Sequence, residues 1–275
     1  MRNSAIHLVE NSQIINAIEQ LRQLSQINVQ TNWRSHLTDL PIFEATESNL
    51  LDWKTVELNA KGHISWAAGT VLWLSQKFVI PQSLNGYPIA GLALRLVLIW
   101  WADSAQIYIN GELVQEGDLF DCSTRVLLSP CVIPGEVITV TLRLVSPSHD
   151  YGALVKSLCV YESTNNQRLE ASFIADELAV LHKYIETFDP EKLPTLATSI
   201  GDINWAALPH DIVTFENSLN TLRQNLIQSQ IYPFLPPLPI SGDDADECVS
   251  PIPPLNKGGL GGVSSPKISL LGHAH

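Results

Sequence analysis

Two histidines at the end of the chain have the residue type and spacing of metal ligands or of acid–base groups. His273 and His275 are separated by one residue, and in an extended segment residues i and i+2 point to the same face. Imidazole binds zinc and exchanges protons near neutral pH. The alternative is that both are ordinary polar residues at a frayed terminus, and either way two histidines alone do not hold zinc tightly.

A short apolar run comes directly before these histidines. Ile268, Leu270 and Leu271 form the kind of run that a fully buried parallel strand uses, and Gly272 ends it. Such a strand presents the side chains that follow it at the carboxyl edge of a sheet or barrel. The sequence stops after His275, so we expect a catalytic domain that is truncated after its first strand.

The residues Leu270-Leu271-Gly272-His273-Ala274-His275 resemble the first strand of the catalytic domain of glycoside hydrolase family 38, the zinc-dependent α-mannosidases. That family opens with hydrophobic-Gly-His-x-His-x-Asp. The resemblance covers nearly the whole chain, in the order of the cytosolic-type enzymes, but only the family's N-terminal portion. It implies hydrolysis of terminal α-mannosides in glycans, with His275 as a zinc ligand and His273 beside it.

The family's motif continues to an aspartate, which this sequence lacks. The resemblance implies a retaining mechanism with two carboxylates, and it places both of them, with the other zinc ligands, on polypeptide outside this chain. We therefore expect no tightly bound zinc and no turnover by this chain alone. A complementary catalytic polypeptide is the expected partner.

Residues 66–162 contain many short β-rich runs separated by turn signals, which predicts a β-sandwich that folds independently. Asn110-Gly111 joins two alternating runs and predicts a type I′ hairpin turn. The pattern resembles the jelly-roll, galactose-binding-like modules attached to many glycosidases. The predicted strands are Thr70–Leu74, Lys77–Ile80, Leu92–Trp101, Ala105–Ile109, Glu112–Gln115, Arg125–Leu128, Val137–Val145 and Leu154–Tyr161.

Helical spacing of apolar residues predicts helices on both sides of this region. One runs from Glu10 to about Leu24, another from Gln167 to Phe188, and a third from Asp211 to Ser229, with Asp211 as its N-cap or as an acidic residue of its first turn. The last two are expected to pair antiparallel. The predicted organisation is an N-terminal helix and irregular lead-in (1–65), the β-sandwich (66–162), a helical connector (163–232), a disordered Pro/Gly-rich linker (233–266) and the first strand of a missing α/β barrel (267–275).

The net charge of −12 argues against nucleic acid and anionic membrane surfaces as partners. No segment has the pattern of a signal peptide or a membrane span, so we expect a cytoplasmic protein. The four cysteines Cys122, Cys131, Cys159 and Cys248 show no metal-binding spacing. We expect free thiols, three of them in strands.

Several other residues invite a sugar-binding interpretation, and each has a structural alternative that we favour. Trp66, Trp73, Trp100, Trp101 and Tyr108 are of the type that stacks on sugars, but they are expected in the sandwich core, with Trp100 and Trp101 on opposite faces. The side chains expected in turns, rather than at a sugar or calcium site, are Asp103, Asn110, Glu112 and Asp118.

Two functions follow from the sequence. The first is an N-terminal fragment of an α-mannosidase that carries the accessory sandwich and helices. The second is a non-enzymatic carbohydrate-binding or protein-interaction module built on the same sandwich.

Overall fold

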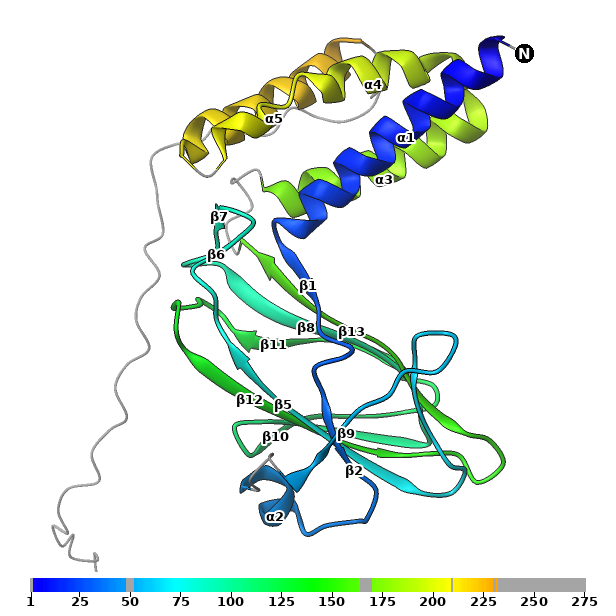
Figure 1. Cartoon of the computed structure of the whole chain (residues 1–275), viewed down its shortest axis with the longest axis vertical. Helices are drawn as coiled ribbons and strands as arrows, with labels where there is room; N and C mark the ends of the chain where they lie inside the picture. The colour runs from blue at the N-terminus through cyan, green and yellow to red at the C-terminus, as the bar shows by residue number, and fades with distance from the viewer. Residues whose placement is uncertain (1, 48–51, 164–169, 209, 230, 232–275) are drawn as a thin grey trace, which may run out of the picture. The chain divides into compact units, whose positions relative to one another are not determined.

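The computed structural model describes residues 2–47, 52–163, 170–208, 210–229 and 231 (Figure 1). The predicted linker (233–266), the predicted barrel strand (267–275), His273 and His275 lie outside the described residues. All of the structural statements below concern the described ranges.

One of the two large sheets, sheet A, is antiparallel and has five strands. Its order is β1-β13-β8-β11, and β4 also pairs with β13, beyond the end of the β1 pairing. The strands are β1 (Gln26–Asn28), β4 (Ile64–Trp66), β8 (Ala93–Trp101), β11 (Ser123–Ser129) and β13 (Gly152–Glu162).

The other large sheet, sheet B, is also antiparallel, with six strands in the order β10-β9-β12-β5-β2-β3. A separate two-stranded hairpin is formed by β6 and β7. The strands are β2 (Arg34–His36), β3 (Lys54–Thr55), β5 (Val71–Val79), β6 (Ser83–Leu84), β7 (Tyr87–Pro88), β9 (Ser104–Ile109), β10 (Glu112–Asp118) and β12 (Val137–Val145).

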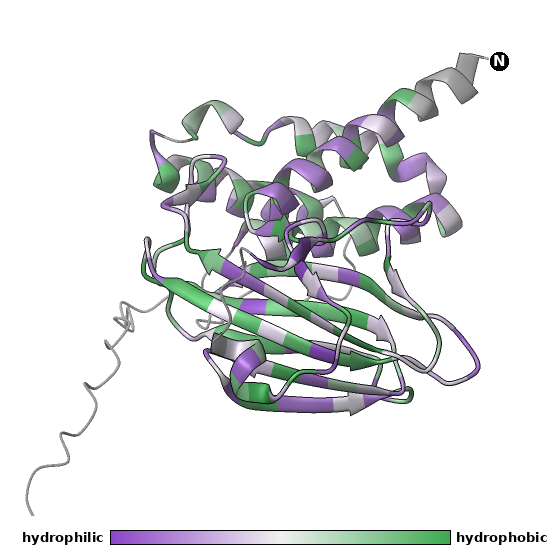
Figure 2. Cartoon of the chain, turned by 60° about the horizontal axis from the view of Figure 1, so that its bottom comes forward, coloured by the Kyte–Doolittle hydropathy of each residue, from purple (hydrophilic) through white to green (hydrophobic). Residues whose placement is uncertain are grey.

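The two sheets share one hydrophobic core, which confirms the predicted β-sandwich. Along β12, Ile138, Val140, Leu142 and Leu144 are buried, which follows from the side-chain period of two in a strand. The strands carry long apolar stretches, whereas the helices mix apolar and polar residues (Figure 2). The runs predicted as two strands at 70–74 and 77–80 form the single strand β5.

The predicted hairpin turn between β9 and β10 is present. Asn110 has φ 49° and Gly111 has φ 87°, and two successive positive φ values are what a type I′ turn requires. The Asn110 side chain also accepts a hydrogen bond from the Thr139 amide, 2.9 Å away. The turn is therefore fastened to the neighbouring strand β12.

The sequence pattern predicted that the sandwich starts at residue 66. In the structure it starts much earlier, at β1. Strands β1, β2, β3 and β4 all come from residues 26–66, which had been predicted as an irregular lead-in. Trp33 is fully buried and donates through Nε1 to Ser157 Oγ, 2.9 Å away. These strands are only two or three residues long, too short for a periodicity to show in the sequence.

Helices from the two ends of the described chain form a layer next to the sandwich (Figure 1). The predicted helices at 10–24 and 211–229 are confirmed, although the first starts earlier, at Arg2. The helix predicted at 167–188 is confirmed from Ala171 onward, because Glu170 is extended and 167–169 lie outside the described residues. Asp211 caps the last helix by accepting from the Thr214 amide at 3.0 Å. The elements are α1 (Arg2–Gln23), α2 (Ile42–Glu47), α3 (Ala171–Phe188), η2 (Pro190–Lys192), α4 (Leu193–Gly201), η3 (Trp205–Ala207) and α5 (Ile212–Gln228).

The helices do not simply form the predicted α3–α5 pair. The N-terminal helix α1 packs against both α3 and α4, and α4 packs on α5 (Figure 1). The helical layer also contacts the sandwich, because the Tyr87 hydroxyl donates to Glu216 on α5 over 2.9 Å. The helical unit is thus assembled from both sides of the sandwich sequence.

The cysteine prediction is correct in part. Cys122 and Cys159 are free thiols, whereas Cys131 is disulfide-bonded, so the prediction of free thiols is wrong at Cys131. Of these three, Cys159 alone lies in a strand. In the described part of the chain, no helix is long and apolar enough to cross a lipid bilayer.

Candidate functional site

The described residues do not bring together a set of metal ligands. Within the ranges that the structure covers, no group of three His, Cys, Asp or Glu side chains is placed to hold a metal ion. The described part of the chain therefore does not form a zinc site, and the role of His275 stays a prediction from the family resemblance.

The candidate sugar-stacking aromatics occupy the positions expected of core residues. Trp66, Trp73, Trp100 and Tyr108 are each less than 5% exposed, whereas Trp101 is 39% exposed. Trp100 and Trp101 therefore point to opposite faces of β8, as predicted. These four buried rings are not available to a ligand in this conformation.

The candidate polar contacts lie in or beside turns. Asp118 accepts hydrogen bonds from the backbone amides of Phe120 and Asp121, at 2.7 and 3.0 Å. These two bonds, led by that from Asp121, hold the pKa of the Asp118 carboxyl below its usual value. Asp103 lies in the tight connection between β8 and β9, and Glu112 opens β10 after the Asn110-Gly111 turn. Asp118 thus acts as a turn-stabilising carboxylate.

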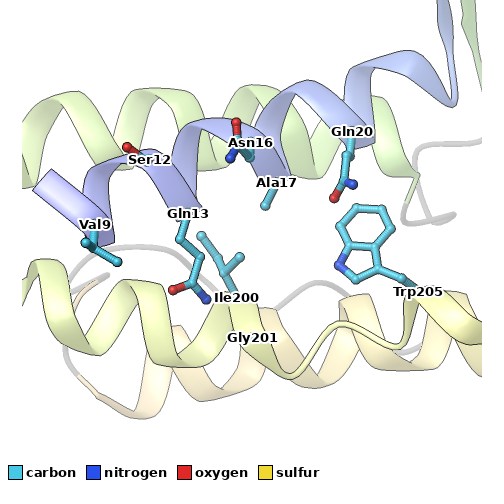
Figure 3. A pocket seen from close by; sticks show the side chains of 9 residues that line it. All are labelled: Val9, Ser12, Gln13, Asn16, Ala17, Gln20, Ile200, Gly201 and Trp205. Carbon is cyan, nitrogen blue, oxygen red and sulfur yellow. The ribbon is translucent and has the colours of Figure 1, made fainter.

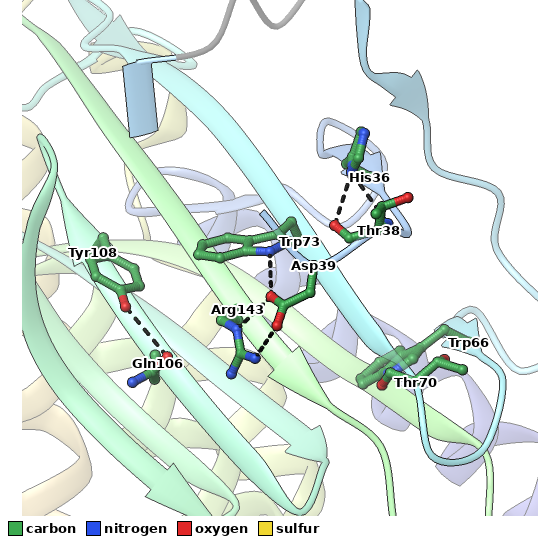
Figure 4. A network of polar contacts seen from close by, with 9 residues as sticks. All are labelled: His36, Thr38, Asp39, Trp66, Thr70, Trp73, Gln106, Tyr108 and Arg143. Atoms are coloured by element: carbon green, nitrogen blue, oxygen red, sulfur yellow. Dashed lines mark hydrogen bonds and ion pairs between the residues drawn. The ribbon is translucent and has the colours of Figure 1, made fainter. Parts of the chain in front are cut away.

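A polar and aromatic cluster that the sequence did not reveal covers the outer face of sheet B (Figure 4). Arg143 on β12 donates through Nε and Nη2 to the two carboxylate oxygens of Asp39, at 2.9 and 2.7 Å. Trp73 on β5 also donates to Asp39, over 3.3 Å. The Arg143 guanidinium lies 6.0 Å from the centre of the Trp73 ring. The centres of the Trp73 and Tyr108 rings are 6.1 Å apart.

The electrostatics of this cluster keep Asp39 ionised and bound to Arg143. Its hydrogen bond with Arg143, aided by the positive charge of Arg143 and by the Trp73 bond, holds the pKa of Asp39 below its ordinary value, against a smaller opposing effect of burial. Asp39 is therefore ionised at neutral pH and has its oxygens engaged, so it is unsuited to general acid catalysis. It fastens the segment before α2 to the sheet, where Ala45 and Trp53 bury Trp73 and Tyr108.

A hollow surface lies elsewhere, between α1 and the α4–η3 segment (Figure 3). It consists of two adjoining pockets of about 540 and 280 Å³ that share Gln20 and Trp205. We call the two together the α1 groove. Its lining residues are Val9, Ser12, Gln13, Asn16, Ala17, Gln20, Gln23, Leu24, Asn85, Ile200, Gly201, Trp205 and Leu208.

The groove walls come from elements that the hydrophobic pattern fixes. Ile14, Ile18 and Leu21 of α1 are buried against the other helices, which turns Asn16 and Gln20 of the same helix toward the groove. Gln13 donates through Nε2 to the carbonyl of Ala197 on α4, 3.1 Å away, and so ties the two walls together. Trp205 is held from behind by Phe215, with ring centres 5.8 Å apart.

The sequence analysis did not single out the groove, although one signal was present. Polar uncharged residues recur along α1 at positions 12, 13, 16, 20 and 23, a helical spacing that marks one face. Its opposing wall, from Ile200 to Trp205, required knowledge of how α1 packs on α4, and the sequence did not predict that packing.

The buried cysteine in the sandwich is not a nucleophile. Cys159 is 2% exposed, and burial raises the pKa of its thiol to about 12. The thiol is therefore protonated at neutral pH, and the thiolate is the reactive form.

Comparisons with known proteins show a distant structural similarity to part of the family 2 glycoside hydrolases. A family 2 member from Bacteroides cellulosilyticus matches 51% of this chain and 21% of its own at 13% identity and a TM-score of 0.41. A β-glucuronidase from Bacteroides uniformis matches 50% of this chain and 17% of its own, at 17% identity and a TM-score of 0.37. A β-glucuronidase from Ruminococcus gnavus, solved with D-glucuronic acid, matches 50% of this chain and 29% of its own, at 12% identity and a TM-score of 0.37.

The matched region spans less than a third of each of these solved chains. No protein-family profile matches the chain, and no curated protein matches it in sequence. These comparisons do not identify the family of the chain.

Proposed function

We propose that this chain is the accessory N-terminal part of a glycoside hydrolase, and specifically of a zinc-dependent α-mannosidase of family 38. The observation that carries the proposal is the order of the chain: the helix α1, a β-sandwich, the helices α3 to α5, and then the segment Leu270–His275 that resembles the family's first catalytic strand. In this proposal the sandwich and helices support a catalytic domain, and the substrates of the assembled enzyme are α-mannoside glycans.

The charged groups that the structure describes support an accessory role. Arg143 and Asp39 form a two-point ion pair, Arg223 and Glu177 form a buried one, and Arg95 and Arg125 both donate to Glu162. Each of these pairs joins one element to another. The catalytic carboxylates and most zinc ligands are proposed to belong to a complementary polypeptide, with His275 contributed by this chain.

Co-expression tests the proposal. The gene for this chain is expressed alone, and together with a family 38 catalytic polypeptide encoded next to it. We expect chelator-sensitive hydrolysis of an aryl α-mannoside by the co-expressed pair and none by this chain alone. Chelator-sensitive hydrolysis by the purified chain alone, or equal activity of the catalytic polypeptide with and without it, contradicts the proposal.

A non-enzymatic carbohydrate-binding module is the second candidate, and the α1 groove is the observation that favours it. The DNA immediately downstream of the codon for His275 separates the two candidates. An aspartate-containing continuation followed by a barrel-sized open reading frame supports the mannosidase, and unrelated sequence there supports the module.

A further inference from the structure

We infer that the α1 groove binds a neutral oligosaccharide. The inference concerns a surface formed by the helical layer and by Asn85 of the β6–β7 hairpin, and it does not rest on the family 38 proposal. Its basis is the combination of uncharged lining, primary amides on one wall and an aromatic ring on the other.

The first step is the charge of the lining. None of the described residues that line the two pockets is ionisable, although the chain as a whole has 44 Asp, Glu, Lys and Arg residues and a net charge of −12. A phosphate, carboxylate or ammonium ligand would find no counter-ion in the lining, and unpaired desolvated charge is costly. The groove therefore fits a ligand without charge.

The second step is the hydrogen-bonding capacity of the wall formed by α1. Among the described residues, the side-chain amides of Asn16 and Gln20 make no hydrogen bond to the protein. The side-chain amide of Gln13 donates one hydrogen bond, to the carbonyl of Ala197. A primary amide both donates and accepts, as a sugar hydroxyl does. Three such amides along one helix face suit a ligand that carries hydroxyl groups at intervals.

The third step is the opposite wall. Figure 3 shows the Trp205 ring between the two helices and next to Gln20. Because Phe215 packs against Trp205, the indole is held in place before any ligand binds. An ordered aromatic ring offers an apolar surface at low entropic cost, and the C–H face of a pyranose ring is the apolar part of a sugar.

The fourth step is size. The larger pocket, about 540 Å³, is within the range of ~300–1,000 Å³ typical of small-molecule sites. Lining positions run from Val9 to Leu24 on α1, which is about 22 Å at ~1.5 Å of rise per residue. This length exceeds one sugar ring, so the inference is for a short oligosaccharide that passes Trp205.

The chain offers a matched pair of substitutions at the groove floor. Gly201 ends α4, and a Cβ added there meets only the Gln13 amide nitrogen, at 3.6 Å, which is an ordinary contact. The substitution Gly201→Ala is therefore tolerated and leaves the groove open. Gly201→Phe adds an aromatic ring at the same position, and we expect this ring to occupy the groove next to Gln13.

The experiment is a titration of the full chain, with its tryptophan indole nitrogens labelled for NMR. The titrants are soluble trisaccharides of α-mannose, α-glucose, β-glucose and β-galactose. We expect at least one to shift the Trp205 indole signal in a saturable way while the signal of Trp101, exposed on the sandwich, stays unchanged. Gly201→Ala should bind as the wild type does, and Gly201→Phe and Gln20→Ala should each bind roughly tenfold more weakly or worse.

Three results overturn the inference. The first is the absence of a Trp205 shift with every trisaccharide at millimolar concentration. The second is an equal shift at Trp101, and the third is unchanged affinity in Gly201→Phe. The mannosidase co-expression assay reports on a different segment, so failure of either proposal is recognised separately.

Discussion

At the scale of single residues, Asp39 shows what a sequence conceals. It precedes Arg143 by 104 positions, yet both carboxylate oxygens accept from that guanidinium. Nothing in the local pattern around Asp39 distinguishes it from a solvent-exposed loop residue. By contrast, Asn110-Gly111 and the cap Asp211 act on neighbours in the sequence, and both were predicted correctly.

Asp39→Asn should lower stability by about 1 kcal/mol or less at neutral pH, because the Asp39 side chain is half exposed and solvent screens the pair. The folded-state pKa of Asp39 is depressed, so its contribution is present above the unfolded pKa of ~3.9 and is lost as pH falls through the folded pKa. The difference in unfolding free energy between wild type and variant should therefore shrink in acid.

Denaturant unfolding at several pH values measures this difference. Asp202→Asn is the control, since the Asp202 side chain makes no hydrogen bond or ion pair in the described part of the structure. A difference between wild type and Asp39→Asn that grows on acidification would show that Asp39 is not held ionised by Arg143.

A second residue-scale prediction concerns two glycines. A Cβ at Gly152 on β13 would overlap the Trp66 ring, whereas one at Gly201 meets only an ordinary contact. Gly152→Ala should destabilise the protein by about 1–3 kcal/mol through overpacking, and Gly201→Ala should have little effect. Thermal melts of the two variants decide this, and equal melting temperatures would refute the close packing of Trp66 on β13.

At the scale of elements, the strands β8, β9 and β11 to β13 and the helices α1, α3 and α5 were predictable because each carries an apolar run or period longer than a few residues. The strand β10 has no buried face and was predictable from the Asn110-Gly111 turn before it. The strands β1 to β4 could not be predicted, because strands of two or three residues, such as Gln26–Asn28, are too short to show a period. The packing of α1 on α4, which creates the groove, depends on contacts between residues such as Gln13 and Ala197. These two residues are 184 positions apart in the sequence, so their contact leaves no local pattern.

The link between α3 and α5 yields an element-scale prediction. Arg223 on α5 is 5% exposed and donates through Nε to both oxygens of Glu177 on α3, at 3.0 and 3.1 Å. Glu177→Ala leaves that guanidinium buried without a counter-charge, so we expect a loss of about 3 kcal/mol. Glu186→Ala, which breaks the exposed pair with Lys183 on the same helix, is the control and should change stability little. Similar unfolding free energies for the two variants would contradict a structural role for the buried pair.

At the scale of the whole molecule, neither the sandwich nor the helical layer matches the predicted boundaries, because the helix α1 precedes the sandwich in the sequence and the other packed helices follow it. Residues 26–66 supply edge strands to both sheets, and α1 joins helices that follow the sandwich. A boundary at residue 66 separates segments that pack together. The sequence pattern identified the sandwich by its central strands and missed its edges.

This organisation changes the expectation for an isolated sandwich. A fragment of residues 66–162 lacks β1, β2 and the fully buried Trp33, so we expect it to melt at a lower temperature than a fragment of residues 25–162, or without cooperativity. Circular dichroism of the two fragments compares them. Equal, cooperative melting would show that the edge strands add nothing to the sandwich.

The central claim is that this chain contributes a zinc ligand to an assembled mannosidase, and His275 is the residue on which it depends. The most direct measurement is the α-mannosidase activity and zinc content of the co-expressed pair carrying His275→Ala, beside a pair carrying His149→Ala, a substitution at an exposed loop histidine. The account predicts that His275→Ala lowers both activity and bound zinc strongly while His149→Ala leaves both unchanged. Full activity and full zinc in the His275→Ala pair would contradict it.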